Sequence, residues 1–337
     1  MRGAAARLPR VVATARSYCA VSGPHQDLLR DAGFELVLAA PEVPLDAPAL
    51  AHLARDADAL LLGLDHCDAS VFEAAPRLRV VARYGVGVDN VDLDAAAAHG
   101  VVVPNTPGAN TIAVAELTLS LLLALARDLP TAIEHVRGGG WSRSVGWELA
   151  GRTLGLVGIG RIGREVAVRA QAFGMRVVAA DPLAPDVPGV ERVALDELWG
   201  ASDAVSLHVG LSSATRHLVD ARALERMRPH AVLVNTARGG LVDEGALASA
   251  LRRGVIAGAA ADCFEHEPPG DSPLLALPTF IATPHLGAGT AEAAHRMGMA
   301  AARNVVAVLT GDGEADVVAG PRAGAESARS HDPRRER

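Results

Sequence analysis

Three side chains in the second half of the chain could together reduce a keto acid. Arg238, Glu267 and His285 each follow shortly after an apolar run of the kind that forms a buried parallel strand. Parallel sheets bind ligands at the carboxyl ends of their strands, so we expect the three residues to line one crevice. There a guanidinium can bind a substrate carboxylate, and an imidazolium can donate a proton to a carbonyl oxygen as hydride arrives. A carboxylate beside the imidazole favours its charged form.

Each of these residues also has an ordinary explanation when it is taken alone. An arginine after a strand is usually a surface charge, a glutamate before a proline is usually solvated, and a single histidine is more often structural. Only the combination, with a source of hydride beside it, predicts hydride transfer.

A source of hydride is indicated by residues 153–181, which read TLGLVGIGRIGREVAVRAQAFGMRVVAAD. An apolar run leads into Gly158-x-Gly160-x-x-Gly163, helical spacing follows, and a second apolar run ends on Asp181. This is the β-α-β fingerprint of dinucleotide binding. Gly158 allows a tight turn, Gly160 lets the backbone approach a pyrophosphate, and Gly163 lets the helix pack closely on the strand. Asp181 lies 18 residues beyond Gly163, where an acid meets the adenosine ribose hydroxyls. The alternative is a glycine-rich turn in another kind of α/β protein.

The residues after Asp181 predict NAD as the cofactor in preference to NADP. Pro182, Leu183 and Ala184 follow it, without an arginine to bind a 2′-phosphate. A carboxylate at this place would also repel that phosphate.

The surrounding pattern predicts an α/β protein with two doubly wound parallel sheets. Strand-like and helix-like runs alternate through the first part of the chain and again after the glycine motif. A long helix is predicted over residues 111–127, and because it is apolar nearly all round it should be buried, in a core or at a domain or subunit interface. Residues 1–8 and 321–337 have little to bury, so we expect an unstructured lead-in and a disordered tail.

Composition limits the function further. The 337 residues suffice for two domains, and a formal charge of −7 argues against a nucleic-acid partner. The chain contains no lysine, which excludes Schiff-base chemistry, a pyridoxal phosphate anchor and a P-loop. Cys19, Cys67 and Cys263 are far apart and predict neither a disulfide framework nor a metal site. No apolar stretch is long enough for a signal peptide or a membrane span, so we expect a cytoplasmic protein without a membrane partner.

Five motifs extend the pattern over roughly residues 10 to 315. They are NTARGGLVDE at 235–244, ADCFEHEP at 261–268, TPHLGAGT at 283–290, RYGVGVDN at 83–90 and NTPGANT at 105–111. Together they resemble the D-isomer-specific 2-hydroxyacid dehydrogenases, and most nearly their phosphoglycerate dehydrogenase-like branch. The resemblance implies a Rossmann NAD-binding domain of residues 110–285, inserted into a flavodoxin-like substrate domain of residues 1–109 and 286–320.

The resemblance also implies roles for individual residues in the interconversion of a small 2-keto acid and its D-2-hydroxy acid. Arg238 would bind the carboxylate, His285 would be the acid and base, and Glu267 its partner. Backbone amides of the first domain would also bind the carboxylate, namely those of Gly85, Val86 and Gly87. NAD would contact Gly158, Gly160, Arg161, Ile162, Gly163, Asp181, Thr236, Ala237, Asp262, Gly287 and Ala288. Family members are commonly homodimers, and the apolar helix 111–127 would suit such an interface.

One departure from the family bears on the substrate. Gly63-Leu64-Asp65-His66 stands where phosphoglycerate dehydrogenases usually carry Arg-Ser, and we interpret the acidic residue as unfavourable to a phosphorylated substrate. Three alternatives stay open. They are 3-phosphoglycerate dehydrogenase proper, an oxidoreductase of an unusual acid such as phosphite, and a non-catalytic NAD-sensing protein resembling the C-terminal binding protein co-repressors.

Overall fold

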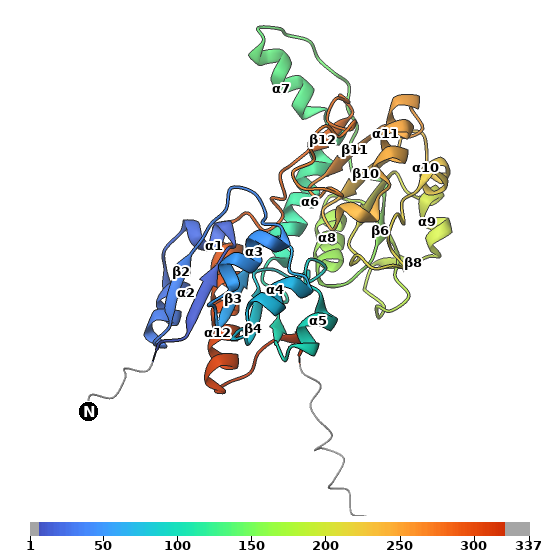
Figure 1. Cartoon of the computed structure of the whole chain (residues 1–337). Helices are drawn as coiled ribbons and strands as arrows, with labels where there is room; N and C mark the ends of the chain where they lie inside the picture. The colour runs from blue at the N-terminus through green and yellow to red at the C-terminus, as the bar shows by residue number, and fades with distance from the viewer. Residues whose placement is uncertain (1–6, 321–337) are drawn as a thin grey trace, which may run out of the picture. The chain divides into compact units, whose positions relative to one another are not determined.

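A computed structural model describes residues 7–320 of the chain (Figure 1). The predicted tail and most of the predicted lead-in lie outside the described residues. The chain divides into two compact units, one made of Met1–Ala109 with Ala294–Arg337 and the other of Asn110–Ala293. The return to the first unit comes a few residues after the predicted 285/286, because Gly287 packs against Val114 and is hydrogen-bonded to Asp262, both in the second unit.

The first unit is built on a four-stranded parallel sheet in the order β2-β1-β3-β4. Its strands are short aliphatic runs, and β3 and β4 are buried at every position because helices cover both faces. The strands are β1 Arg10–Ala13, β2 Glu35–Leu38, β3 Ala59–Leu62 and β4 Val80–Arg83. The helices are α1 Arg16–Ala20, α2 Pro24–Asp31, α3 Ala47–Ala54, α4 Ala69–Ala74, α5 Leu93–Ala98 and α12 Ala291–Thr310, of which the first three residues of α12 fall in the second unit. A small antiparallel pair joins β5 Val103–Pro104 to β13 Val317–Ala319.

The second unit contains a seven-stranded parallel sheet in the order β12-β11-β10-β9-β6-β7-β8. The order reverses between β6 and β9, which is the switch point where such sheets bind ligands. The strands are β6 Thr153–Val157, β7 Arg176–Ala180, β8 Val190–Arg192, β9 Ala204–Leu207, β10 Val232–Asn235, β11 Gly258–Ala261 and β12 Phe280–Ala282. The helices are α6 Thr111–Ala126, α7 Leu129–Arg137, α8 Arg161–Ala172, α9 Leu195–Ala201, α10 Ala221–Arg226 and α11 Glu244–Arg253, with a 3-10 turn η1 at Gly239–Leu241. The predicted α/β class with two parallel sheets is confirmed.

Aspartates at the helix starts explain where several of these helices begin. Asp46, Asp92, Asp220 and Asp243 each accept a hydrogen bond from a backbone N–H in the first turn of α3, α5, α10 and α11. Such caps satisfy donors that the helix itself leaves unpaired, and they are among the strongest local signals for a helix start.

The apolar helix α6 belongs to the core of its own unit. Ala115, Leu119 and Leu122 pack in one buried cluster with Ile159 and Val166, the latter on α8. The helix therefore contributes to a core, as the sequence allowed, and its part in a subunit interface stays a prediction. No helix within residues 7–320 combines the length and the apolar character that a membrane crossing requires.

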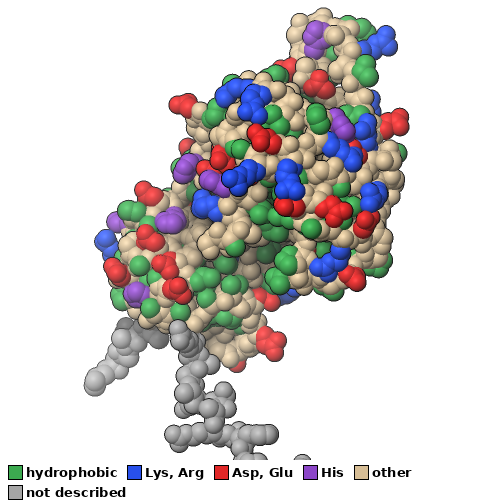
Figure 2. All heavy atoms as spheres, turned by 90° about the vertical axis from the view of Figure 1, so that its right-hand side faces the viewer, with side chains coloured by type: hydrophobic (Ala, Val, Ile, Leu, Met, Phe, Trp, Pro, Cys, Tyr) green, Lys and Arg blue, Asp and Glu red, His purple; other side chains and the backbone are tan. Residues whose placement is uncertain are grey.

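Helix α7 differs from the other helices described in its unit. None of its residues is buried, and in Figure 1 it extends away from the sheet to which α6 is packed. On the face shown in Figure 2, basic and acidic side chains are interspersed over the surface, which gives that face a mixed charge.

A buried aspartate joins three elements at the amino end of the larger sheet. Asp203 precedes β9, and its carboxylate accepts hydrogen bonds from the Thr153 amide at 2.8 Å, from Arg228 at 2.8 Å and from His230 at 2.7 Å. Burial alone would raise the pKa of Asp203, but the bonds from His230, Thr153 and Arg228 outweigh it and lower the pKa to about 2. The ionised carboxylate thus connects β6, β9 and the loop before β10.

Replacing this carboxylate by an amide should destabilise the fold. Asp203→Asn should lower the free energy of unfolding at pH 7 by about 2 kcal/mol, because a carboxyl whose pKa falls from 3.8 to about 2 gains about that much from ionising in the folded protein. The stabilisation is present above the ordinary pKa and is lost as the pH falls toward 2, so the difference from wild type should narrow there. Urea unfolding at pH 7 and at pH 2 to 4 measures it.

The matched control is Asp196→Asn, which breaks the exposed ion pair with Arg226 and should cost little. Equal unfolding midpoints for the two variants at pH 7 would contradict the anchoring role of Asp203.

Candidate active site

The glycine loop after β6 has the backbone geometry that a pyrophosphate site needs. Gly158 has a φ of +92°, and a Cβ on it would lie 2.7 Å from the His208 carbonyl oxygen. A Cβ on Gly163 would lie 2.4 Å from the carbonyl oxygen of Gly158, so only glycine lets α8 pack this closely. Gly160 faces open space instead, with no heavy atom within 4 Å of a Cβ built there. The backbone at Gly160 can therefore be approached from outside.

Helix α8 begins directly at this opening. Gly160 is its N-cap and contributes no side chain to cap the first turn, which holds Arg161 and Ile162. Uncapped amides at a helix start attract an anion, because they point outward and carry the positive end of the helix dipole. The residues present therefore fit a dinucleotide phosphate.

Asp181 directly follows β7 and is hydrogen-bonded to the same glycine loop. Its carboxylate accepts hydrogen bonds from the amides of Ile159 at 2.9 Å, Leu183 at 2.9 Å and Ala184 at 3.0 Å. Burial opposes ionisation, but these amides and the nearby charge of Arg192 lower the pKa of Asp181. Asp181 is thus a fixed negative charge at the edge of the glycine loop.

The sequence analysis missed Arg192, which lies at the end of β8 and contacts the loop that follows β7. Its guanidinium donates hydrogen bonds to the carbonyl oxygens of Asp181 and Ala184 and lies 3.5 Å from Asp186. The sequence interpretation concerned only the residues that follow Asp181, and it did not consider an arginine on a neighbouring strand. Only the pairing of β7 with β8 reveals it.

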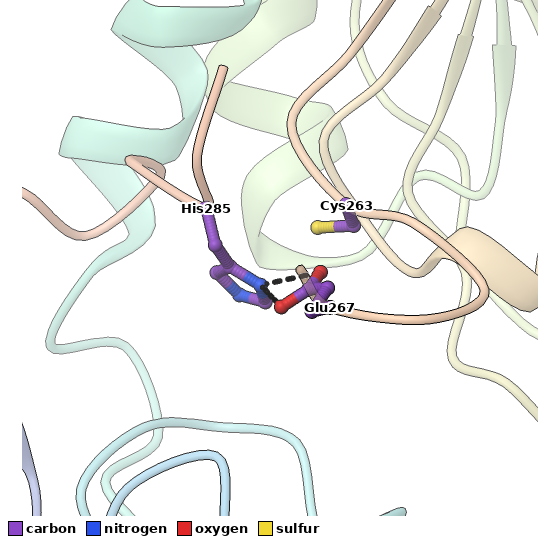
Figure 3. A group of neighbouring side chains, drawn as sticks. All are labelled: Cys263, Glu267 and His285. Carbon is purple, nitrogen blue, oxygen red and sulfur yellow. Dashed lines mark hydrogen bonds and ion pairs between the residues drawn. The ribbon is translucent and has the colours of Figure 1, made fainter. Parts of the chain in front are cut away.

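His285 and Glu267 form a close pair at the carboxyl edge of the sheet (Figure 3). Nδ1 of His285 lies 2.9 and 2.8 Å from the two carboxylate oxygens of Glu267, and about a quarter of each side chain is exposed, 26% and 24%. Burial disfavours the charged ring, but contacts with Cys263 and with Glu267 outweigh it and raise the pKa of His285 to about 10. The imidazolium form is therefore the stable one at neutral pH, with Nδ1 directed to the carboxylate.

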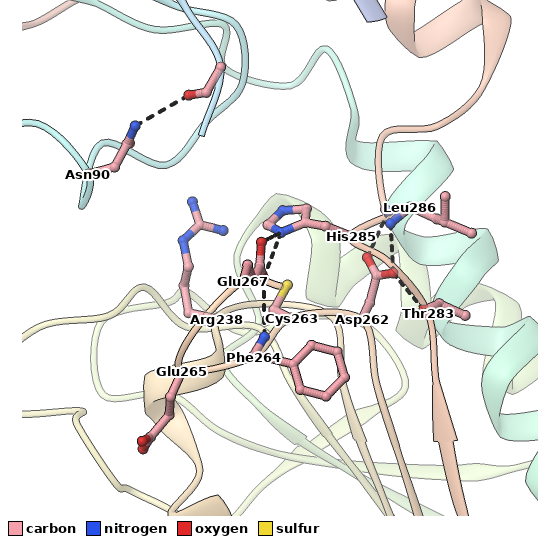
Figure 4. A network of polar contacts seen from close by, with 12 residues as sticks. Asn90, Arg238, Asp262, Cys263, Phe264, Glu265, Glu267, Thr283, His285 and Leu286 are labelled. Atoms are coloured by element: carbon pink, nitrogen blue, oxygen red, sulfur yellow. Dashed lines mark hydrogen bonds and ion pairs between the residues drawn. The ribbon is translucent and has the colours of Figure 1, made fainter. Parts of the chain in front are cut away.

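The loop that carries His285 is held by a single buried carboxylate, as Figure 4 shows. Asp262 follows β11 and is fully buried; it accepts hydrogen bonds from the Thr283 hydroxyl at 2.6 Å and from the amides of Leu286 at 2.7 Å and Gly287 at 2.8 Å. The amide of His285 donates to the Asp262 carbonyl oxygen at 2.9 Å, with φ of +53° at His285. Burial raises the pKa of Asp262 despite the bonds from Thr283 and the two amides.

Asp262 therefore positions the loop, a role that sequence reasoning did not assign to it. Its predicted contact with the cofactor stays a prediction, as do those of Gly287 and Ala288, which lie on the loop between β12 and α12.

Arg238 projects from the turn after β10, on the same side as His285 and Glu267 in Figure 4. Asn235 is buried and shapes this turn by donating to the Arg238 carbonyl oxygen at 2.8 Å and accepting from the Ala237 amide at 3.1 Å. The structure thus brings together the three residues that the sequence reasoning grouped. The hydroxyl of Thr236 is buried and shares a 2.9 Å hydrogen bond with Thr118 of α6, and its predicted contact with the cofactor stays a prediction.

The predicted carboxylate-binding loop lies in the first unit. The amide of Gly85 already donates a hydrogen bond to the Thr106 hydroxyl at 3.1 Å, so in this conformation it is not available to donate to a ligand. The carbonyl oxygens of Val86 and Gly87 accept from Asn105 and Arg83 at 2.7 and 2.8 Å, and these bonds fix the path of the loop. Carboxylate binding stays a prediction for the amides of Val86 and Gly87.

Asp65 does not present the acidic surface that the sequence suggested. It is almost completely buried, and its carboxylate accepts from the Thr14 hydroxyl at 2.6 Å and the Leu45 amide at 2.9 Å. The interpretation of Asp65 as a charge that repels phosphate was wrong, because hydrogen bonds from residues distant in sequence turn the side chain into the unit. The absence of an arginine from residues 63–66 is unaffected.

Comparison with known proteins decides the family. The sequence model of the D-isomer specific 2-hydroxyacid dehydrogenase NAD binding domain matches residues 119–287. Glyoxylate reductase from Korarchaeum cryptofilum is 44% identical over 291 residues, which are 83% of this chain and 88% of that protein. The chain belongs to the D-isomer-specific 2-hydroxyacid dehydrogenases. This confirms the resemblance carried by the five motifs and makes the chain an enzyme of an NAD-binding oxidoreductase family.

Two other proteins are also similar to this chain. D-3-phosphoglycerate dehydrogenase from Methanocaldococcus jannaschii is 45% identical over 272 residues, 78% of this chain and 52% of that protein. The chain thus spans about half the length of such phosphoglycerate dehydrogenases. The crystal structure of the TT0316 protein from Thermus thermophilus superposes with a TM-score of 0.84 at 41% identity, covering 92% of this chain and 99% of that one.

Removing the charge of Glu267 should change the protonation of this dehydrogenase at His285. In Glu267→Gln the pKa of His285 should fall from about 10, because the amide cannot stabilise the imidazolium as the carboxylate does and Cys263 alone then opposes the effect of burial. Histidine NMR between pH 5 and 11 measures this without turnover, and the resonance missing from His285→Asn identifies the ring.

Glu265→Gln is the control, because Glu265 pairs with His217 and not with His285. A His285 titration that is the same in wild type and Glu267→Gln would show that the carboxylate does not hold the proton.

Proposed function

We propose that this family member is an NAD(H)-dependent reductase of small, unphosphorylated 2-keto acids, which it interconverts with D-2-hydroxy acids. The observation that carries the proposal is the His285–Glu267 pair, charged at neutral pH and on the same side of the sheet edge as Arg238. Glyoxylate and hydroxypyruvate are the proposed substrates, in line with the glyoxylate reductase above and with a Thermotoga maritima hydroxypyruvate reductase that is 46% identical over 68% of this chain.

In this proposal the chain's own residues bind the acid and supply the proton. Arg238 binds the substrate carboxylate with its planar guanidinium and aligns the neighbouring carbonyl. The Nε2–H of His285 donates its proton to the carbonyl oxygen, and Glu267 stabilises the positive charge until that moment. When bound at the glycine loop, NADH supplies the hydride. In the reverse direction neutral His285 accepts the hydroxyl proton, so oxidation needs the deprotonated ring.

The residues after β3 favour an unphosphorylated acid. A phosphate needs charge-assisted donors to replace its water, and arginine is the best of these. Residues 63–66 supply no arginine, and Arg83 nearby is buried and donates to the carbonyl oxygens of Leu62 and Gly87. 3-Phosphoglycerate dehydrogenase proper is the second candidate, favoured by the 45% identity to the Methanocaldococcus enzyme.

We further propose NAD as the cofactor in preference to NADP. The fixed negative charge of Asp181 stands where the ribose 2′ position is expected and would repel a phosphate there. Arg192 offers partial compensation, but its guanidinium is hydrogen-bonded to backbone carbonyls and next to Asp186.

A substrate panel tests the proposed activity. With NADH, glyoxylate and hydroxypyruvate should each show a kcat/KM at least about tenfold above that of 3-phosphohydroxypyruvate, because a site without a phosphate-binding arginine gains little from the phosphate. NADPH should be the poorer donor. His285→Ala should lose turnover by about a thousandfold while NADH fluorescence titration shows unchanged binding. A preference for 3-phosphohydroxypyruvate would support the second candidate, and tight NADH binding without any turnover would support an NAD-sensing role.

A homodimer remains a proposal, and the structure favours a different surface for it from the one predicted. Helix α6 is occupied by the core, whereas α7 exposes Leu129, Ile133 and Val136 by 44%, 47% and 52%. These positions are spaced four and three residues apart, so they lie on one face of α7. Exposed apolar side chains on one helix face are typical of a surface that another chain covers.

Placing a charge on that face should prevent dimer formation. Ile133→Asp should sediment as a monomer at micromolar concentration, where wild type sediments as a dimer, since a carboxylate in an apolar interface loses its hydration. Leu183→Asp is the control, because Leu183 is exposed and apolar but lies on the loop after β7. Monomeric wild type, or a dimeric Ile133→Asp with unchanged circular dichroism, would refute the α7 interface.

A further inference from the structure

Cys263 lies beside the proposed proton donor, although the proposed reaction does not use it. Its Sγ, one ligand atom of His285 and one carboxylate oxygen of Glu267 all lie within 4.8 Å of one another. Figure 3 shows the sulfur and the carboxylate on the same side of the imidazole, with the sulfur above the carboxylate. Among residues 7–320 this is the one group of three such side chains close enough to share a metal ion.

The three side chains are the ligand types that a zinc ion takes up. A thiolate, an imidazole nitrogen and a carboxylate oxygen bind Zn²⁺ at about 2.3, 2.0 and 2.0 Å, which puts ligand atoms roughly 3.5 Å apart around a tetrahedron. Nδ1 and the carboxylate are already closer than that, at 2.8 Å, so small rotations of the Glu267 and Cys263 side chains bring all three onto one ion. Water would take the fourth position, as in zinc sites with three protein ligands.

Burial and charge also suit a small soft cation. Cys263 is only 3% exposed and its Sγ donates to the Ala237 carbonyl oxygen at 3.4 Å, so bulky thiol reagents are disfavoured. Glu267 and His285 are each about a quarter exposed and leave an open side through which an ion can enter. A thiolate and a carboxylate together balance the two charges of Zn²⁺, so the occupied site adds no net charge beside Arg238.

We propose that Cys263, Glu267 and His285 form a zinc site and that Zn²⁺ bound there inhibits the enzyme. Binding releases the thiol proton and the Nδ1 proton to solvent and changes no oxidation state. The ion then occupies Nδ1 and the carboxylate, so Glu267 no longer pairs with the ring and His285 is held as a metal ligand. The inhibitory effect rests on the proposed function, whereas the metal site rests on the geometry alone.

Metal binding is measured first, on the full chain after treatment with a chelator. Zn²⁺ should bind at about one equivalent in competition with a chromophoric chelator, and Cys263→Ser should weaken the affinity at least about tenfold. Cys19→Ser is the matched control, since Cys19 is a free thiol in the other unit and should leave the affinity unchanged. Co²⁺ added to wild type should give a thiolate-to-metal charge-transfer band in the near ultraviolet, a reading that needs no variant.

Turnover is then measured with NADH and the best keto acid of the panel. Zn²⁺ should inhibit wild type and Cys19→Ser alike, chelator should restore activity, and Cys263→Ser should need at least about ten times more Zn²⁺ for the same inhibition. Equal zinc affinity of Cys263→Ser and wild type, or no charge-transfer band with Co²⁺, would overturn the site. If Zn²⁺ binds through Cys263 but no acid is reduced, the site stands and the proposed function falls.

Discussion

The candidate site depends on the burial of one carboxylate, that of Asp262. Placing a carboxylate in the interior costs several kcal/mol unless donors replace its lost water, and here a hydroxyl and two amides do so. All three donors come from residues 283–287, so the loop adopts the one path that brings them to the carboxylate. That path places His285 at a φ of +53°, a conformation that a histidine adopts only when the surroundings enforce it, and turns its ring to Glu267.

Two buried aspartates lie at opposite ends of the larger sheet, and one holds strands together while the other holds the loop of the candidate site. Asp203, at the amino end, receives hydrogen bonds from Arg228 and His230, and the pKa of its carboxyl falls to about 2. Asp262, at the carboxyl end, receives hydrogen bonds from a hydroxyl and two amides and is more deeply buried, and its pKa rises. The difference follows from the partners, because a cationic donor stabilises the ionised form far more than an amide does. The sheet is thus anchored by ion pairs at its amino end, while at its carboxyl end the charge of His285 is paired with Glu267 and not with the buried aspartate.

Much of this arrangement could be predicted from the sequence, because strand ends and glycine spacing are local signals. Aliphatic runs located the strands, and parallel order alone then placed Arg238, Glu267 and His285 on one edge. The failures concern side-chain partners that are distant in sequence. The Asp65 side chain points inward to Thr14, which is 51 residues away in sequence, and no local sequence pattern predicts this contact. Arg192 lies near Asp181 only because their strands pair in the sheet. The Gly85 amide donates its hydrogen bond to the hydroxyl of Thr106, which lies on another loop.

The long apolar helix shows a second limit of the sequence. The apolar character of α6 was read correctly, but a helix buried by its own unit and a helix buried by a second chain have the same sequence pattern. Only the residues that pack against α6 in the folded protein distinguish these two cases.

The order of strands also explains why a dinucleotide suits this edge. Asp181 follows β7, the glycine loop follows β6, Arg238 follows β10, and His285 follows β12. From β6 to β12 there are four strand steps, roughly 19 Å at about 4.8 Å per step, although the loops shorten this by reaching inward. In the proposed reaction, a hydride donor anchored by its phosphates at β6 would extend over β9 and β10 to bring its hydride to the side of the proposed proton donor, His285. In the same proposal, the adenosine half would lie on the opposite side of β6 and meet Asp181. A cofactor extended in this way, with its phosphates at β6, would place its adenosine half toward β7 and its reacting ring toward β12.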